Sequence, residues 1–447
     1  MSRSAPRKCV RWLEGELPAL VSDGVISSET SDALKARYQA SAQARSNLGF
    51  ILLAVIGSVL VGAGIILLIA HNWDDLSRTL RTVIAFLPLL VALGLGAFVL
   101  LRRPESTPWR ESVAIFDIAG VGAAISLVSQ IFQIQGTVAD FILVWTLLSL
   151  PIVYLFQSTT AAAAYLAGIT AWMLDKGDFW GRQNGSMFYW LLLALIIPYY
   201  LVVLRRDLAS GAFKFLSVVL ILSLTAAVAA TSELTRTGLG NVTYAGFFTA
   251  VYLWGFYLSE DDELNVISLL GGLGVGATAL VLTFEDVWRF QSNYFWDRLG
   301  SERWIALTVQ ILFPLIAILL AGWIYWRRQK FPYAITAALL PIVTIAAWLC
   351  ANFAPAGEYA IQTPFSSGGA AFMNLFTLVL GIELLVRGIR ADSIGRANFG
   401  LAVIAALALC RFFDSDLSFV TRGLGFIGVG AGFLVANIIF FRKRAAA

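Results

Sequence analysis

The 447-residue sequence contains few charged residues and few of the residues that usually build metal or disulfide sites. Asp, Glu, Lys and Arg make up 13% of the chain, which has one histidine and three cysteines. His71 alone excludes a site with several histidine ligands, and Cys9, Cys350 and Cys410 are too scattered for a paired spacing. We therefore expect no bound metal and no other cofactor.

The common motifs of nucleotide binding and hydrolysis are also missing. The chain has no Walker loop, no GxSxG elbow, no HExxH pair and no CxxC pair. ATP-driven transport by this chain alone is therefore disfavoured, and no motif indicates an enzyme. The formal net charge of +4 does not indicate nucleic-acid binding, because the arginines form short clusters between apolar runs.

Apolar residues dominate instead. They account for 59% of the chain, and the mean hydropathy is +0.78, as expected when side chains face lipid. We predict an all-α, polytopic helical membrane protein with about 14 transmembrane helices, each near the ~20 residues that cross a bilayer. The predicted spans are 49–70, 82–101, 113–135, 141–156, 159–174, 187–204, 215–230, 242–258, 266–284, 304–326, 331–350, 369–387, 398–412 and 423–441.

The positive charges predict an orientation. With the N-terminus in the cytoplasm, roughly two thirds of the Lys and Arg residues fall in cytoplasmic segments. This bias places both termini inside and favours an even number of spans. Few charges lie in mid-span, which argues against a proton pump or a voltage sensor.

The sequence divides into a cytoplasmic headpiece, residues 1–46, and a transmembrane domain, residues 47–447. The headpiece lacks the apolar core of a signal peptide. Apolar residues from Trp12 to Val21 recur at helical spacing, Asp23-Gly24 ends that helix, and Ser27 opens a second one. A helical hairpin this small buries little surface, so we expect it to dock on the membrane domain or on a cytoplasmic protein.

The densest polar chemistry follows the first predicted span, on the outer face. His71 and the carboxylates of Asp74 and Asp75 could form an acid/base or ligand-binding cluster. Equally, Asp74 or Asp75 could simply cap the next helix while Trp73 sits in an interfacial aromatic belt. Asp75-Leu76-Ser77 and Arg81 recur as Asp416-Leu417-Ser418 and Arg422, which fits either shared boundary chemistry or a weak internal repeat. The candidate outer-face cluster comprises His71, Asn72, Trp73, Asp74, Asp75, Arg81, Arg411, Asp414, Asp416 and Arg422.

A second candidate lies inside the third span. Asp117 sits among small residues, and Gln130 and Gln133 are expected on one helix face farther along. Such a polar stripe serves either hydrogen bonding between helices or the lining of a cavity or solute path. Glu383 and Arg387, four residues apart, are expected to form a local ion pair, and Asn374 to bond between helices.

Several stretches resemble domain-of-unknown-function family 2157, a group of predicted bacterial membrane proteins. The resemblance lies in Gly24-Val25-Ile26-Ser27 through Arg37-Tyr38, Ala70-His71-Asn72-Trp73-Asp74, Gly122 to Leu127 with Gln130, Gly136, Trp145, Leu150 and Pro151, and Arg411-Phe412-Phe413-Asp414 to Arg422-Gly423. It implies a multi-pass protein of the bacterial inner membrane and no established activity.

Three functions remain open. The first is a transporter or flippase for an amphipathic or envelope-precursor molecule. The second is a membrane-embedded enzyme that acts on a lipid-linked substrate at the outer face, with His71, Asp74 and Asp75 as acid/base or metal-coordinating groups. The third is a membrane scaffold or sensor. The expected partners are the bilayer, a lipid or amphipathic ligand, and a cytoplasmic protein bound by the headpiece.

Overall fold

The protein is all-helical throughout the part that the computed structural model describes. That part covers residues 16–34, 76–176, 185–206, 208, 210–235, 239–258, 265–289, 303–328, 335–353, 364–391, 393–412 and a few positions between 420 and 432. The chain divides into two compact units, Met1–Ile84 and Ala85–Ala447, and the division falls within helix α4.

The first unit contains a short helical hairpin, residues 16–22 and 28–34. Gly24 has a φ of +69°, the left-handed conformation that glycine adopts without strain. The amide of Val25 donates to the Leu20 carbonyl at 3.0 Å, which closes the first helix. Ser27 Oγ accepts from the Thr30 amide at 3.2 Å and caps the second. Both boundaries lie where the sequence predicted them, whereas the predicted domain boundary at residue 46 is outside the described residues.

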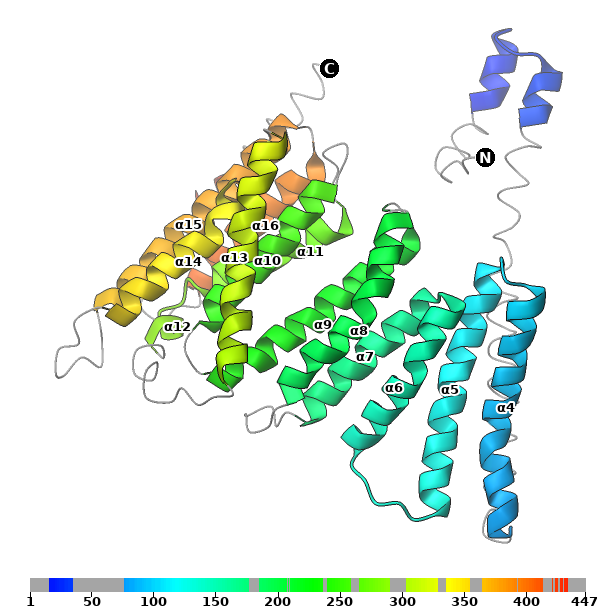
Figure 1. Cartoon of the computed structure of the whole chain (residues 1–447). Helices are drawn as coiled ribbons and strands as arrows, with labels where there is room; N and C mark the ends of the chain where they lie inside the picture. The colour runs from blue at the N-terminus through cyan, green and yellow to red at the C-terminus, as the bar shows by residue number, and fades with distance from the viewer. Residues whose placement is uncertain are drawn as a thin grey trace. The chain divides into compact units, whose positions relative to one another are not determined.

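Each predicted span from 82–101 to 398–412 coincides with one helix (Figure 1). The longer helices are α4 (Arg78–Arg102), α5 (Thr107–Ile131), α6 (Val138–Phe156), α7 (Thr159–Lys176), α8 (Gly185–Arg206), α9 (Gly211–Thr235), α10 (Gly240–Leu258), α11 (Val266–Val281), α13 (Arg303–Arg328), α14 (Ile335–Phe353), α15 (Pro364–Arg390) and α16 (Ile394–Phe412), with a single turn at α12 (Asp286–Arg289). Spans 49–70 and 423–441 lie wholly or largely outside the described residues.

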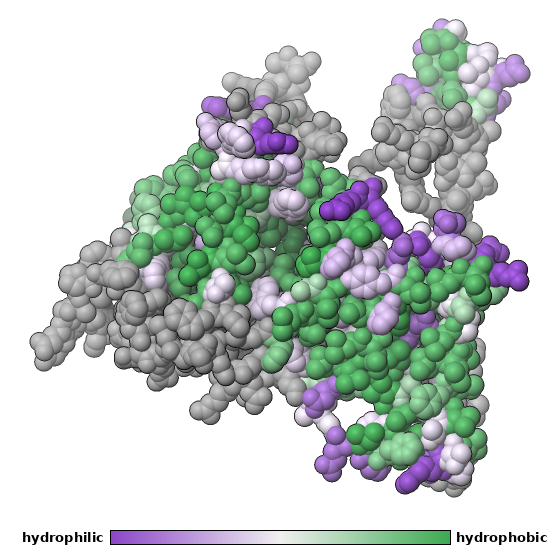
Figure 2. Space-filling model, viewed as in Figure 1, coloured by the Kyte–Doolittle hydropathy of each residue, from purple (hydrophilic) through white to green (hydrophobic). Residues whose placement is uncertain are grey.

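Eight helices in the described part are long and apolar enough to cross a bilayer: α4, α5, α6, α8, α9, α13, α15 and α16. Helices α11 and α14 are shorter apolar helices. Large apolar side chains such as Leu90, 62% exposed, and Leu101, 80% exposed, lie on the surface of the described part, as expected of side chains that face lipid. Figure 2 shows hydrophobic side chains over the helices, with hydrophilic ones mainly toward the helix ends.

Helix α10 lies at the centre of the helices around it, and its buried residues occur on every side. Its glycines allow neighbouring backbones to approach closely. A Cβ added to Gly246 would lie 2.3 Å from the Pro314 nitrogen of α13, and one added to Gly255 would lie 2.2 Å from the Ser268 nitrogen of α11. Such small-residue contacts are the usual means of packing helices in a membrane, where lipid removes the hydrophobic drive.

A threonine of α10 also satisfies a backbone carbonyl that a proline leaves without a donor. A proline has no N–H, so the carbonyl four residues before it loses its helical partner. Thr249 Oγ1 donates to the Ala337 carbonyl of α14, four residues before Pro341, at 3.2 Å. Thr243 Oγ1 lies 3.4 Å from the Gln310 carbonyl oxygen of α13, four residues before Pro314, but donates to the nearer Leu239 carbonyl at 2.8 Å.

Candidate functional site

Asp117 is buried in the middle of α5, with 1% of its surface exposed. Its Oδ2 faces Gly96 of α4, where an added Cβ would lie 3.0 Å from Oδ2 and 3.0 Å from the ring of Phe156 on α6. Its Oδ1 has no hydrogen-bond partner among the described residues. The carboxyl group is therefore buried, with apolar side chains on the side that faces Gly96.

The contact between α4 and α5 around Asp117 is close. A Cβ added to Gly120, one turn farther along α5, would lie 3.2 Å from the Leu89 Cα and 3.3 Å from the Ala92 Cβ of α4. Small residues thus bring the two backbones together, as the sequence predicted for this span. A carboxyl group without a partner in such a site is costly, and such groups in membrane helices usually have a function.

The other two residues of the predicted polar stripe, Gln130 and Gln133, do not extend the helix face on which Asp117 lies. Helix α5 ends at Ile131, and Gln133 has a φ of 54°, so the prediction of a helix up to residue 135 is wrong. Gln133 Nε2 donates to the Gln130 carbonyl at 3.1 Å, and both side chains are exposed. The three-residue spacing therefore does not put Gln130 and Gln133 on one face, because the backbone has left the helix between them.

A second carboxylate, Glu111 at the start of α5, caps the N-terminus of α7. Its Oε1 accepts from the Thr159 amide at 2.9 Å, and its Oε2 accepts from the Thr160 amide at 3.0 Å. The hydroxyls of Ser158 and Thr160 donate to Oε2 at 2.5 Å each. Two of the amides that a helix start leaves unpaired thus bind a carboxylate from another helix, which also complements the helix dipole.

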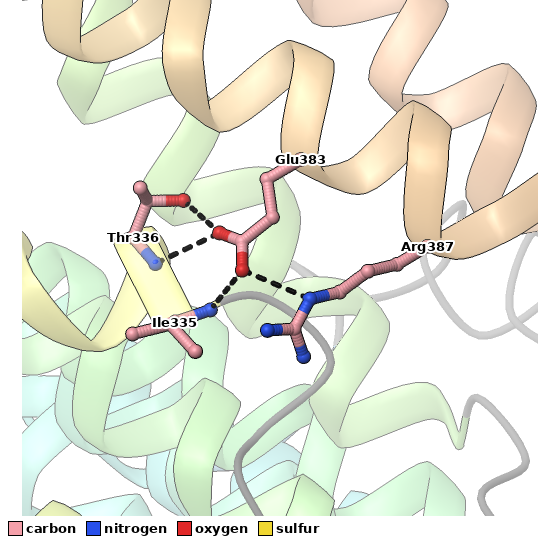
Figure 3. Close-up of polar contacts among 4 residues, drawn as sticks. All are labelled: Ile335, Thr336, Glu383 and Arg387. Carbon is pink, nitrogen blue, oxygen red and sulfur yellow. Dashed lines mark hydrogen bonds and ion pairs between the residues drawn. The ribbon is translucent and has the colours of Figure 1, made fainter. Parts of the chain in front are cut away.

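Glu383 of α15 does the same for α14 (Figure 3). Its Oε1 accepts from the Ile335 amide and its Oε2 from the Thr336 amide, both at 2.9 Å, and the Thr336 hydroxyl also donates to Oε2. Arg387 Nε lies 2.9 Å from Oε1, which confirms the predicted ion pair. Capping of a distant helix was not foreseen for either residue. The sequence feature that could have indicated such a cap is a Glu near a membrane boundary together with a Thr at the start of another helix.

The described part of the outer-face candidate includes Arg411, at the end of α16. Its guanidinium lies 4.7 Å from the centre of the Phe284 ring, within reach of a cation–π contact, and donates to Thr283 Oγ1 at 3.3 Å. Asn374 of α15 donates to the Thr283 carbonyl at 3.1 Å, so it bonds between helices as expected. The ends of α11 and α16 therefore meet the first half of α15 around Thr283.

Trp288, an aromatic residue of the following segment, belongs to the core. It is 3% exposed, and its indole N–H donates to the Leu282 carbonyl at 2.9 Å. It packs beside Gly369 of α15, where an added Cβ would lie 3.5 Å from the ring. Trp288 is thus not available for stacking on a ligand at the surface.

Arg81 is the other described member of the outer-face candidate, and it belongs to the first unit. Its Nε donates to the Leu76 carbonyl at 2.9 Å. Ser77 directly precedes α4, and its Oγ accepts from the Leu80 amide at 3.3 Å, so Ser77 holds the capping position considered for Asp74 or Asp75. The remaining candidates, His71, Asn72, Trp73, Asp74, Asp75, Asp414, Asp416 and Arg422, lie outside the described residues. No group of three or more His, Cys, Asp or Glu residues that could hold a metal occurs in the described part.

These features define a polytopic helical membrane protein, whose apolar helices have the bilayer as their environment. Residues 18–162 match the sequence model of the family described as "Predicted membrane protein (DUF2157)". The matched residues include the hairpin after Gly24, the end of the first predicted span, and Gln130. No curated protein and no solved structure gives a significant match to the chain.

Proposed function

We propose that the protein is a transporter or flippase for an amphipathic or envelope-precursor molecule. The observation that carries this proposal is the presence of two hydrophobic cores in the second unit. The first core is built mainly from α5 to α9 and the second from α10 to α15. Helix α10 contributes to both, since Phe247 belongs to the first core and Ala245 to the second.

The helices around the two cores also contact each other. We call the helices around each core a body. Within the second body, the backbone of α10 approaches the backbones of α11 and α13 closely at Gly255 and Gly246. Between the bodies, α9 lies against α10, α11 and α13. The Trp190 ring of α8 also packs on Phe313 of α13 with centroids 6.1 Å apart, and the Tyr244 hydroxyl of α10 donates to the Thr225 carbonyl of α9 at 3.5 Å. Side-chain contacts can rearrange while each body keeps its packing, as alternating access in transporters requires.

The predicted orientation fits the polar contacts between helix ends. Glu111 binds Ser158, and Arg206 donates to Gln157 at 2.6 Å. All four residues lie at segment ends that the charge bias assigns to the cytoplasm. Thr283 and Arg411 lie at ends assigned to the outside. These pairings support the predicted grouping of the helix ends on two sides. The proposed location in the bacterial inner membrane with both termini in the cytoplasm, where the headpiece would meet a cytoplasmic protein, rests on the charge bias.

The test is flipping of a fluorescent lipid in vesicles that contain the purified protein. We would use NBD-labelled phosphatidylglycerol and follow bleaching by dithionite, which reaches the outer leaflet alone. We expect a larger bleached fraction than in protein-free vesicles. Vesicles with the folded protein that bleach no further than protein-free ones would contradict flipping of lipids of this class.

Cross-linking separates movement of the bodies from a simple leak. In a chain without the native cysteines, Trp190→Cys with Phe313→Cys spans the two bodies, whereas Tyr257→Cys with Trp323→Cys lies within the second, where those rings are 4.7 Å apart. A bis-maleimide should stop flipping in the first pair and spare it in the second. Equal effects on both pairs would show that the bodies do not move against each other.

Binding of the same lipid without flipping would favour the alternative functions. An enzyme at the outer face would then be examined by substitution of Asp74 and Asp416, and a scaffold by capture of cytoplasmic partners on the headpiece.

A further inference from the structure

Asp117 differs from the two other carboxylates that the structure places between helices. Glu111 accepts four hydrogen bonds, and Glu383 accepts three hydrogen bonds in addition to its ion pair with Arg387. Asp117 is more buried than either, and its Oδ1 has no partner in the described part of the chain. On the side of Asp117 that faces Gly96, the nearest described side chains are those of Phe156 and Val113, which offer no hydrogen-bond donor.

The neighbours of Asp117 define what it can bind. Sodium, calcium and magnesium ions need several oxygen ligands around them. On the described side that faces Gly96, the neighbours are a phenyl ring and a valine, which supply no further oxygen ligand. A proton needs one oxygen and no further ligand, so it is the cation that this site can hold.

On the described helices α4 to α7, no other charged group lies near the level of Asp117. Helix α4 has no titratable residue between Arg81 and Arg102. On α5 the nearest ones are Arg110 and Glu111, about two turns before Asp117. On α6 and α7 the nearest are Tyr154 and Tyr165, whose hydroxyls donate to the Leu195 and Leu192 carbonyls of α8. The other titratable residues of α6 and α7, Asp140, Asp175 and Lys176, lie at helix ends.

We propose that Asp117 is a proton-binding site, occupied while α4 and α5 are in contact and emptied when they separate. While α4 and α5 are in contact, the side chain of Asp117 is a neutral carboxylic acid, because an ionised carboxylate without a partner is unfavourable in apolar surroundings. When the Gly96 side opens to water, the O–H bond breaks, the proton passes to water and the carboxylate becomes hydrated. Gly96 and Gly120 allow the close contact that excludes water.

The coupling of this proton to solute movement rests on the proposed function, whereas the site itself does not. One carboxyl group that binds and releases a proton suffices for a proton-linked carrier. It does not provide the chain of groups along which a proton pump relays protons. The low number of mid-span charges is therefore compatible with this role.

The first experiment examines the site without any transport. Dicyclohexylcarbodiimide is an apolar reagent that modifies carboxyl groups in their protonated form. The full-length protein in lipid vesicles would be treated over a range of pH and the modified peptides identified by mass spectrometry. We expect modification of Asp117, with a loss of roughly tenfold per pH unit once the pH exceeds the titration range. Glu111 and Glu383, which accept hydrogen bonds from their helix caps, are internal controls that should stay unmodified.

A second readout covers the case in which the reagent cannot enter. Infrared difference spectra between acid and alkaline pH should show the C=O stretch of a protonated carboxyl group, and Asp117→Asn should lack that band. If neither modification nor this band is found at any pH in the folded protein, Asp117 does not bind a proton and the inference is overturned.

The coupling is then measured in the lipid-flipping assay with an imposed pH difference across the membrane. In the wild-type protein the rate should depend on the gradient, and in Asp117→Asn this dependence should disappear. A pH-dependent Asp117 in a protein that flips no lipid would contradict the proposed function and leave the proton site intact. Flipping that ignores the gradient in the wild type would contradict the coupling.

Discussion

The hydroxyl of Thr249 on α10 lies 3.2 Å from the carbonyl oxygen of Ala337 on α14, the carbonyl that Pro341 deprives of its helical donor. In a bilayer no water can replace such a donor. We expect Thr249→Val, which keeps the shape and removes the hydroxyl, to destabilise the protein by about 1–3 kcal/mol. Thermal unfolding in detergent would show the loss.

The matched control for Thr249→Val is Thr225→Val. Thr225 Oγ1 donates at 2.7 Å to the carbonyl of Ile221 in its own helix, which has no proline four residues on. Thr225→Val should therefore lower the stability of the protein clearly less than Thr249→Val. Equal losses at the two positions would show that the proline-linked carbonyl is not special.

Glu111 should contribute strongly to the stability of the protein, although it lies near a helix end. Glu111→Ala removes the acceptor of four hydrogen bonds at the start of α7, and hydrogen bonds to charged groups are worth more than neutral ones. We expect a loss of roughly 2–4 kcal/mol. Glu105→Ala, an exposed neighbour, should be close to neutral. If the Glu111→Ala protein is as stable as the Glu105→Ala protein, the Glu111 cap does not stabilise the fold.

Glu383 and Arg387 form an ion pair whose two members should have unequal effects. Arg387 is 34% exposed and touches one carboxylate oxygen, so Arg387→Ala should cost less than about 1 kcal/mol. Glu383→Ala also leaves the amides of Ile335 and Thr336 unpaired and should cost about two to three times more. The unfolding temperatures of the two variants measure which of the two side chains contributes more to stability. An effect of Arg387→Ala equal to that of Glu383→Ala would make the ion pair, and not the cap, the source of stability.

The proposed outer-face cluster is tested by Asp74→Cys and Asp416→Cys, singly and together, in a chain without native cysteines. We expect both to react with a membrane-impermeant maleimide added from outside. Cross-linking of the double variant would show that the two Asp-Leu-Ser loops meet. Labelling without cross-linking would leave two separate helix boundaries, and absence of labelling in folded protein would contradict the orientation.

The sequence predicts the positions of the helices well because the bilayer demands long apolar runs, which any window of the chain reveals. It also predicts the Glu383–Arg387 pair, since four residues along a helix fix that distance. It cannot predict that Glu111 binds Thr160, because 49 residues separate them and packing alone joins them. The end of α5 before Gln133 was missed for a related reason. The apolar run continues there, whereas the backbone turns out of the helix.

The helix caps have a consequence for the synthesis of the protein in the cell. Glu111 leaves the ribosome before the start of α7, so the carboxylate is already in place when that helix needs it. Glu383 is made 47 residues after Thr336, which corresponds to roughly 2–10 s of translation at ordinary rates. During that interval the start of α14 must use water, a chaperone or the insertion machinery for its free amides. The cap of α14 is therefore completed only after the Glu383 segment of α15 has been made.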